Sequence, residues 1–129
     1  MNKLLFVIVL MSMVTACGQD DKMQGKQALF LPPVGFKANS DQGDSLYHKI
    51  CAHCHGQQGM GTNNGPPLIH KVYESSHHGD LSFYRAVNKG VQSHHWKFGN
   101  MPPIAGVTAE QVAHIIAYIR REQRKVGIR

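Results

Sequence analysis

The sequence predicts an all-α domain with long loops. Two stretches carry helix signals, one beginning near residue 40 and one after residue 108, and a third lies around residues 80–89. No alternation of apolar and polar residues extends beyond a few positions, so no regular strand is expected. The chain has no internal repeats, and its 129 residues suit one small domain with accessory segments.

The first helix is expected over residues 40–50. Ser40 is a candidate N-cap, and the acidic residues that follow it suit the positive end of a helix dipole. Three apolar residues then recur at helical spacing: Leu46, Tyr47 and Ile50. This helix leads directly into Cys51.

Two further helices are expected in the second half. Asp80 is a candidate cap for one of them, and Gly90 is placed to end it. Thr108 and Gln111 have the spacing of a capping box. The helix behind that box has an apolar face and a basic end, formed by Val112, Ile115, Ile116 and Ile119 and by Arg120, Arg121, Arg124 and Lys125.

The first 39 residues precede this domain. Lys3, an apolar stretch over residues 4–14 and small residues before Cys17 predict an export signal over residues 1–16. The apolar stretch is 11 residues long, whereas a membrane-spanning helix needs about 20. Residues 17–39 are polar and rich in glycine and proline, which predicts a tether. The folded domain is expected over residues 40–129.

Cys17 stands apart from the other two cysteines. The residues VTAC at positions 14–17 resemble the lipobox of bacterial lipoproteins, in which the cysteine is lipidated and becomes the first mature residue. Several acyl chains would anchor the protein stably, because each buried methylene contributes about 0.8 kcal/mol. The alternative is a simple signal peptide with an incidental cysteine.

The motif CAHCH at residues 51–55 is the clearest chemical signal. Two thiols at this spacing add to the vinyl groups of one porphyrin edge, and the histidine after the second thiol reaches the iron. We therefore expect one haem c attached at Cys51 and Cys54, with His55 as the proximal iron ligand. A zinc site would need a second cysteine pair and a thioredoxin-like redox pair a βαβ context, and the sequence has neither.

A methionine is the expected second axial ligand. Met60 lies only five residues past His55, and so short a loop would have to pass around the ring edge. Met101 lies 46 residues past His55 and precedes two prolines that stiffen the backbone. Met101 is therefore the predicted distal ligand, and ligation by His and Met fills both faces of the iron and raises its potential relative to two histidines.

Together these motifs resemble a small bacterial class I cytochrome c, over most of residues 40–124. The matching residues are Gly43, Tyr47, CAHCHG at 51–56, GPPL at 65–68, Met101-Pro102 and Tyr118. The resemblance implies the class I cytochrome c fold, with about three to four helices around one covalently bound haem.

The same resemblance implies roles for four residues outside the haem motif. The first and last helices would cross at Gly43, with Tyr47 against Tyr118. The carbonyl of Pro66 would accept a hydrogen bond from the proximal histidine, and Leu68 would pack on the ring.

Residues 69–99 depart from the family's pattern. They contain the pairs His77-His78 and His94-His95, followed by Trp96. Neutral imidazoles are frequent copper and zinc ligands, so a second metal site is one hypothesis. The other is that these histidines are surface or loop-fixing residues, hydrogen-bonded to the backbone or to a haem propionate.

Charge bears on the expected partners. Lys and Arg number 14 against 8 Asp and Glu, a net charge of +6. For an exported, tethered protein, acidic protein surfaces or anionic lipids are expected rather than nucleic acid.

These observations predict an electron transfer protein that is not an enzyme. It would be lipid-anchored at the periplasmic face of a bacterial membrane, inner or outer. It would pass single electrons from a dehydrogenase or reductase complex to an oxidase or reductase. The alternatives are a haem-based sensor or copper-handling protein that uses the four paired histidines, and a haem peroxidase with an open distal site.

Overall fold

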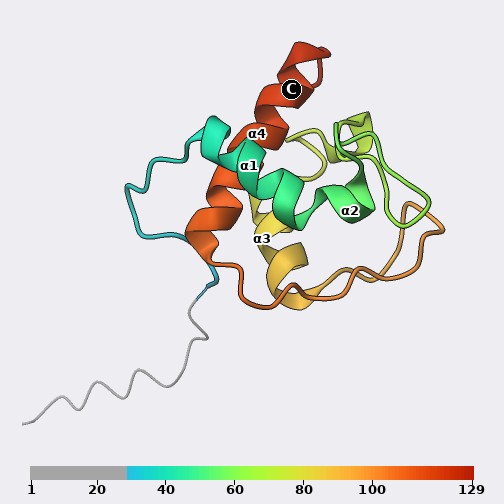
Figure 1. Cartoon of the computed structure of the whole chain (residues 1–129), viewed down its shortest axis with the longest axis horizontal. Helices are drawn as coiled ribbons and strands as arrows, with labels where there is room; N and C mark the ends of the chain where they lie inside the picture. The colour runs from blue at the N-terminus through green and yellow to red at the C-terminus, as the bar shows by residue number, and fades with distance from the viewer. Residues whose placement is uncertain (1–28) are drawn as a thin grey trace, which may run out of the picture.

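The computed structural model describes residues 29–129, which form a helical domain (Figure 1). This part of the chain contains four α-helices: α1 (Ser40–Ile50), α2 (Ala52–His55), α3 (Asp80–Lys89) and α4 (Ala109–Lys125). A 3-10 helix, η1, spans Lys71–Tyr73. Between residues 29 and 129 the only β-type pairings are two isolated bridges, so the predicted all-α class is confirmed. The predicted export signal and Cys17 lie outside the described residues.

Helices α1 and α4 cross and form the main helix pair of the domain (Figure 1). Gly43 lies at the crossing, where a Cβ atom would come within 1.9 Å of the carbonyl oxygen of His114. Only glycine lets the two backbones approach so closely. Beside this contact the rings of Tyr47 and Tyr118 lie 5.0 Å apart, centroid to centroid. The crossing implied by the family resemblance is confirmed.

The N-cap of α1 is Asn39, so the prediction of Ser40 was wrong by one residue. The Oδ1 atom of Asn39 accepts hydrogen bonds from the backbone N–H groups of Asp41 and Gln42, both at 2.9 Å. Its own backbone N–H donates to Nδ1 of His114, at 2.8 Å, on the distant helix α4. This hydrogen bond holds the backbone of Asn39 in the extended conformation typical of an N-cap residue.

The start of α3 also differs by one residue from the prediction. Gly79 occupies the N-cap position, and Asp80 is the first helical residue. The carboxylate of Asp80 accepts a hydrogen bond from Nε of Arg120, at 2.9 Å, instead of capping its own helix. Gly90 ends α3 as predicted, with a φ of 76° that an L side chain rarely adopts.

The last helix begins with the predicted capping box. The backbone N–H of Thr108 donates to Oε1 of Gln111, and the backbone N–H of Gln111 donates to Oγ1 of Thr108, at 3.0 and 3.3 Å. The apolar face of α4 is buried, and its most enclosed members are Val112, Ile115, Ile116 and Ile119. This helix therefore supplies one wall of the interior.

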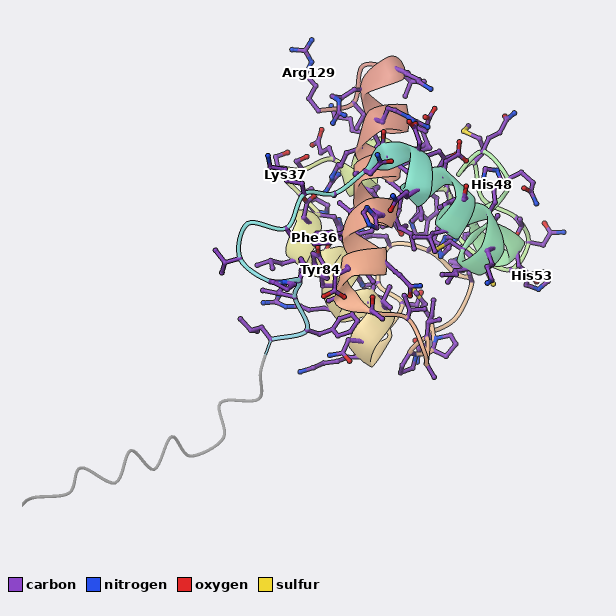
Figure 2. The ribbon with its side chains drawn as sticks, turned by 60° about the vertical axis from the view of Figure 1, so that its left-hand side comes forward. Phe36, Lys37, His48, His53, Tyr84 and Arg129 are labelled. Carbon is purple, nitrogen blue, oxygen red and sulfur yellow. The ribbon has the colours of Figure 1, made fainter. Side chains whose placement is uncertain are left out.

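Residues 29–39 are mostly exposed, but Phe36 in this segment contacts α4. The ring of Phe36 lies edge-on to the imidazole of His114, with centroids 5.2 Å apart, and Figure 2 shows Phe36 beside α4. The end of the predicted tether therefore contacts the domain, a point that the sequence left open. Among the described residues, no helix is both long enough and apolar enough to cross a bilayer.

Candidate functional site

A cavity of about 630 Å³ lies between the helices and the long loops. Its size is within the range of about 300–1,000 Å³ typical of cofactor sites. Much of its wall is apolar and includes Ile50, Phe83, Val91, Val112, Ile115 and Ile116. The wall also brings together the predicted site residues of the folded domain, which are Cys51, Cys54, His55, Pro66, Leu68 and Met101.

The cysteines lie at the junction of α1 and α2. Cys51 ends α1, where its backbone N–H donates to the carbonyl of Tyr47 at 2.8 Å, and it also caps α2. The backbone N–H of His55 donates to the carbonyl of Cys51 at 2.9 Å, so the whole motif occupies one helical turn. Cys51 is buried and Cys54 is exposed at the cavity edge, and no disulfide joins them. Burial raises the pKa of Cys51 to about 12.

The imidazole of His55 has a fixed orientation. Its Nδ1 atom lies 2.8 Å from the carbonyl oxygen of Pro66. A carbonyl can only accept, so Nδ1 carries the proton and Nε2 keeps a free lone pair for a metal. Burial lowers the pKa of His55, and the hydrogen bond to Pro66 partly opposes this shift. The neutral, ligating form is therefore favoured.

The loop of residues 56–68 returns Pro66 and Leu68 to the cavity. The hydroxyl of Tyr47 donates to the carbonyl of Gly56 at 2.8 Å, which holds the start of the loop on α1. At the far end, the backbone N–H of Leu68 donates to the carbonyl of Gly59 at 2.7 Å. Leu68 is buried against the core and borders the cavity.

Met101 reaches the cavity from the loop after α3. Its backbone pairs with that of Val91 through two hydrogen bonds, of 2.9 and 3.0 Å. The loop passes close to Gly90, where a Cβ atom would lie 2.5 Å from the carbonyl oxygen of Met101. Met60, by contrast, is 64% exposed and does not border the cavity.

Trp96 is a cavity residue to which the sequence assigned no role. Its indole N–H is buried and makes no hydrogen bond of ordinary geometry among the described residues, although the side chain of Tyr73 lies near it. An unsatisfied buried donor costs about 1–3 kcal/mol, so an acceptor on a bound group is expected there. The carboxylates of a haem are such acceptors, and the apolar wall, paired thiols and oriented imidazole also suit a haem. The signal in the sequence was a lone tryptophan between a histidine pair and Met101.

The remaining histidines occupy different places. His53, inside the CAHCH motif, is exposed at the outer side of α2 (Figure 2). His70 caps η1, because its Nδ1 accepts from the backbone N–H of Val72 at 3.2 Å. The pairs at 77–78 and 94–95 come together beside the cavity, and three of these four residues border it. Desolvation and the neighbouring imidazoles lower the pKa of His95.

A comparison with protein families gave one match. Residues 40–122 match a family model described as Cytochrome c, which covers most of the described domain. Neither the curated proteins nor the solved structures gave a match.

Proposed function

The chain belongs to the cytochrome c family, and on that premise we propose that it is a membrane-tethered carrier of single electrons with a His/Met-ligated haem. The family itself establishes the cofactor, a covalently attached haem c with its iron, and a role in haem-based electron transfer. One observation carries the finer proposal: two thiols, an oriented imidazole and a methionine thioether border the same cavity.

Cys51 and Cys54 are the proposed attachment points. They lie on one helical turn, so both thiols are available to one edge of a planar group. His55 is the proposed proximal ligand, and its hydrogen bond to Pro66 leaves Nε2 for the iron. When bound, the haem supplies a one-electron couple at its iron.

Met101 is the proposed distal ligand. Its backbone is held by Val91 on one side and followed by two prolines on the other. Filling both axial positions leaves no place for a substrate on the iron, which favours electron transfer over bond chemistry. A thioether ligand and an apolar wall favour the reduced iron, so we expect a higher potential than two histidines would give.

The optical spectrum of the oxidised protein tests the distal ligand. We expect a methionine-to-iron charge-transfer band that disappears in Met101→Ala. Met60→Ala is the matched control, because Met60 is exposed and lies away from the cavity. A band that survives in Met101→Ala, or that is lost in Met60→Ala, would contradict the assignment.

The mass of the denatured protein tests the attachment. The wild-type chain should keep one haem after denaturation, whereas the double variant Cys51→Ala and Cys54→Ala should release it. Each single variant should keep one thioether. A double variant that still carries covalent haem would refute the assignment.

Membrane tethering rests on Cys17 and the lipobox before it. Cytochrome c domains are typically exported, which is consistent with an export signal over residues 1–16. Cys17→Ala should shift the haem-stained protein from the membrane fraction to the soluble fraction with unchanged haem content. A variant that still fractionates with membranes would count against lipidation.

The net positive charge favours redox partners whose docking surfaces are acidic. Without residues 1–16, which contain Lys3, 13 Lys and Arg remain against 8 Asp and Glu, and this net charge of +5 would steer weak, fast encounters with such partners, which salt would screen. Electron transfer to a candidate acceptor oxidase should therefore slow as ionic strength rises. A rate that does not depend on salt would argue against electrostatic steering.

A further inference from the structure

Histidines from two separate loops meet beside the haem cavity. The Nε2 atoms of His77 and His95, 18 residues apart in the chain, lie 3.2 Å from each other. His78 joins them, and one ring nitrogen from each of the three lies within 4.8 Å of the others. Among the described residues, this is the histidine, cysteine or carboxylate group whose geometry would suit a metal ion.

We propose that His77, His78 and His95 form a binding site for a divalent transition metal ion, Zn²⁺ or Cu²⁺. Imidazole nitrogens suit both ions, and Cu²⁺ generally binds such sites more tightly than Zn²⁺. The site is separate from the proposed axial ligands of the haem.

The distance between the two Nε2 atoms fits a shared metal. A tetrahedral zinc ion with bonds of about 2.0–2.1 Å holds its nitrogen ligands about 3.3 Å apart. The separation of 3.2 Å between His77 and His95 is close to this value. One ring nitrogen of His78 lies within 4.8 Å of the other two ligand atoms, which places all three imidazoles within reach of one ion.

A hydrogen bond orients His78 for this role. Its Nδ1 donates to the carbonyl of Val72 at 2.8 Å, so Nε2 keeps the lone pair. Such a bond from the far nitrogen to a carbonyl is the usual outer support of a metal-bound histidine. The backbone nearby is also held, since Arg120 donates to the carbonyl of His78 at 2.5 Å.

His94 is available as a fourth ligand. Its ring lies 4.2 Å from that of His95 and stacks on that of His78 at 5.8 Å, centroid to centroid. Its Nδ1 donates to the carbonyl of Gln92 at 2.9 Å, which again leaves Nε2 free. Without His94, the fourth position would be open to water, as in zinc sites with three protein ligands.

The electrostatic surroundings of the four histidines are compatible with a bound cation. No ion pair described between residues 29 and 129 involves any of these four histidines. Four imidazoles without acidic partners repel one another when protonated, so the neutral form that binds metals is favoured. His78 and His95 border the haem cavity, whereas His77 is exposed and is not part of its wall. A bound cation would therefore add positive charge next to the cofactor.

Titration calorimetry of the full-length, haem-loaded protein with Zn²⁺ alone tests the site. We expect one equivalent of Zn²⁺ per chain, and a loss of affinity of about tenfold or more in His77→Ala combined with His95→Ala. The control is His48→Ala, because His48 is exposed on α1 and pairs with Asp44 instead (Figure 2). Unchanged haem absorbance and far-ultraviolet circular dichroism would show that each variant is folded.

Two further measurements make the result decisive. Cu²⁺ added to the wild type should give an electron paramagnetic resonance spectrum with nitrogen couplings that the double variant lacks. Zn²⁺ should also raise the haem potential of the wild type, because the added charge favours the reduced iron, and should leave that of the double variant unchanged.

Two outcomes would overturn the proposal. They are no binding of either ion, and equal binding by the wild type and the double variant. The binding result does not depend on whether Met101 ligates the iron.

Discussion

Replacing Gly90 tests how the loop that carries Met101 is held. The φ of Gly90 is 76°, and an added Cβ atom would lie 2.5 Å from the carbonyl oxygen of Met101 and 3.1 Å from the nitrogen of Pro103. Gly99 has a similar φ of 86°, but nothing lies within 4 Å of its added Cβ. Both substitutions place an alanine at a positive φ, and only Gly90→Ala adds a close contact with the loop.

The magnitude follows from this difference. The strain of a left-handed alanine costs about 1–2 kcal/mol, and we expect Gly99→Ala to lose only this. In Gly90→Ala the loop must also move by about 0.9 Å to restore an ordinary contact between the Cβ atom and the carbonyl oxygen of Met101, and such overpacking costs about 1–3 kcal/mol more. The paired backbone of Val91 and Met101 would be disturbed. Gly90→Ala should therefore lose stability by about 2–5 kcal/mol.

Equilibrium unfolding in denaturant, followed by circular dichroism, measures both variants. The methionine-to-iron band should weaken in Gly90→Ala at a denaturant concentration where Gly99→Ala keeps it. Equal losses of stability in the two variants, or a band that is unaffected in Gly90→Ala, would refute the close packing of this loop.

Three further predictions concern the contributions of residues in α1 and α4 to stability. Gly43→Ala should lose about 2 kcal/mol in denaturant unfolding because its Cβ would collide with the backbone of α4, while the exposed Ser45→Ala should change stability by under about 0.5 kcal/mol. Arg120→Met should lose about 3 kcal/mol because the carbonyl of Tyr73 and Oε1 of Gln123 lose their donor, and the exposed Arg124→Met should be nearly neutral by the same assay. Burial raises the pKa of Tyr47 in the folded protein, whereas the same side chain ionises near pH 10 in the unfolded chain. The free energy of unfolding should therefore fall as the pH rises above about 10. Tyr47→Phe should lose about 1 kcal/mol at neutral pH with its hydrogen bond, yet show a shallower alkaline decline.

Each of these three predictions would be contradicted by a specific result. A Gly43→Ala protein as stable as Ser45→Ala would contradict the close crossing of α1 and α4. Equal effects of Arg120→Met and Arg124→Met would show that the buried hydrogen bonds contribute little. Parallel alkaline transitions in the wild type and Tyr47→Phe would exclude Tyr47 as a source of the pH dependence.

Local features of the fold were predictable from the sequence. The Thr108 capping box and the glycine stop at Gly90 depend on residues a few positions apart, and both are confirmed. The cap of α1 was misplaced because Asn39 is held by His114, 75 residues away. The start of α3 was misplaced because Asp80 pairs with a residue of α4. Tertiary contacts decided between neighbouring residues of similar capping propensity.

At the site, too, local motifs could be predicted from the sequence, whereas contacts between distant segments could not. The CAHCH motif was readable because its members share one helical turn. The meeting of His77 with His95 depends on the path of two loops, which spacing along the chain does not reveal. The buried indole N–H of Trp96 could not be foreseen, because the sequence marks this residue only as the chain's one tryptophan.

The coordination of the haem iron in the purified protein distinguishes a six-coordinate electron carrier from a haem with an open distal face. Ligation by His55 and Met101 predicts a low-spin, six-coordinate spectrum in the oxidised protein and no ready binding of carbon monoxide to the reduced protein. It also predicts that Met101→Ala binds carbon monoxide. A high-spin oxidised spectrum, together with ready carbon monoxide binding by the reduced wild type, would contradict an electron carrier ligated by His55 and Met101.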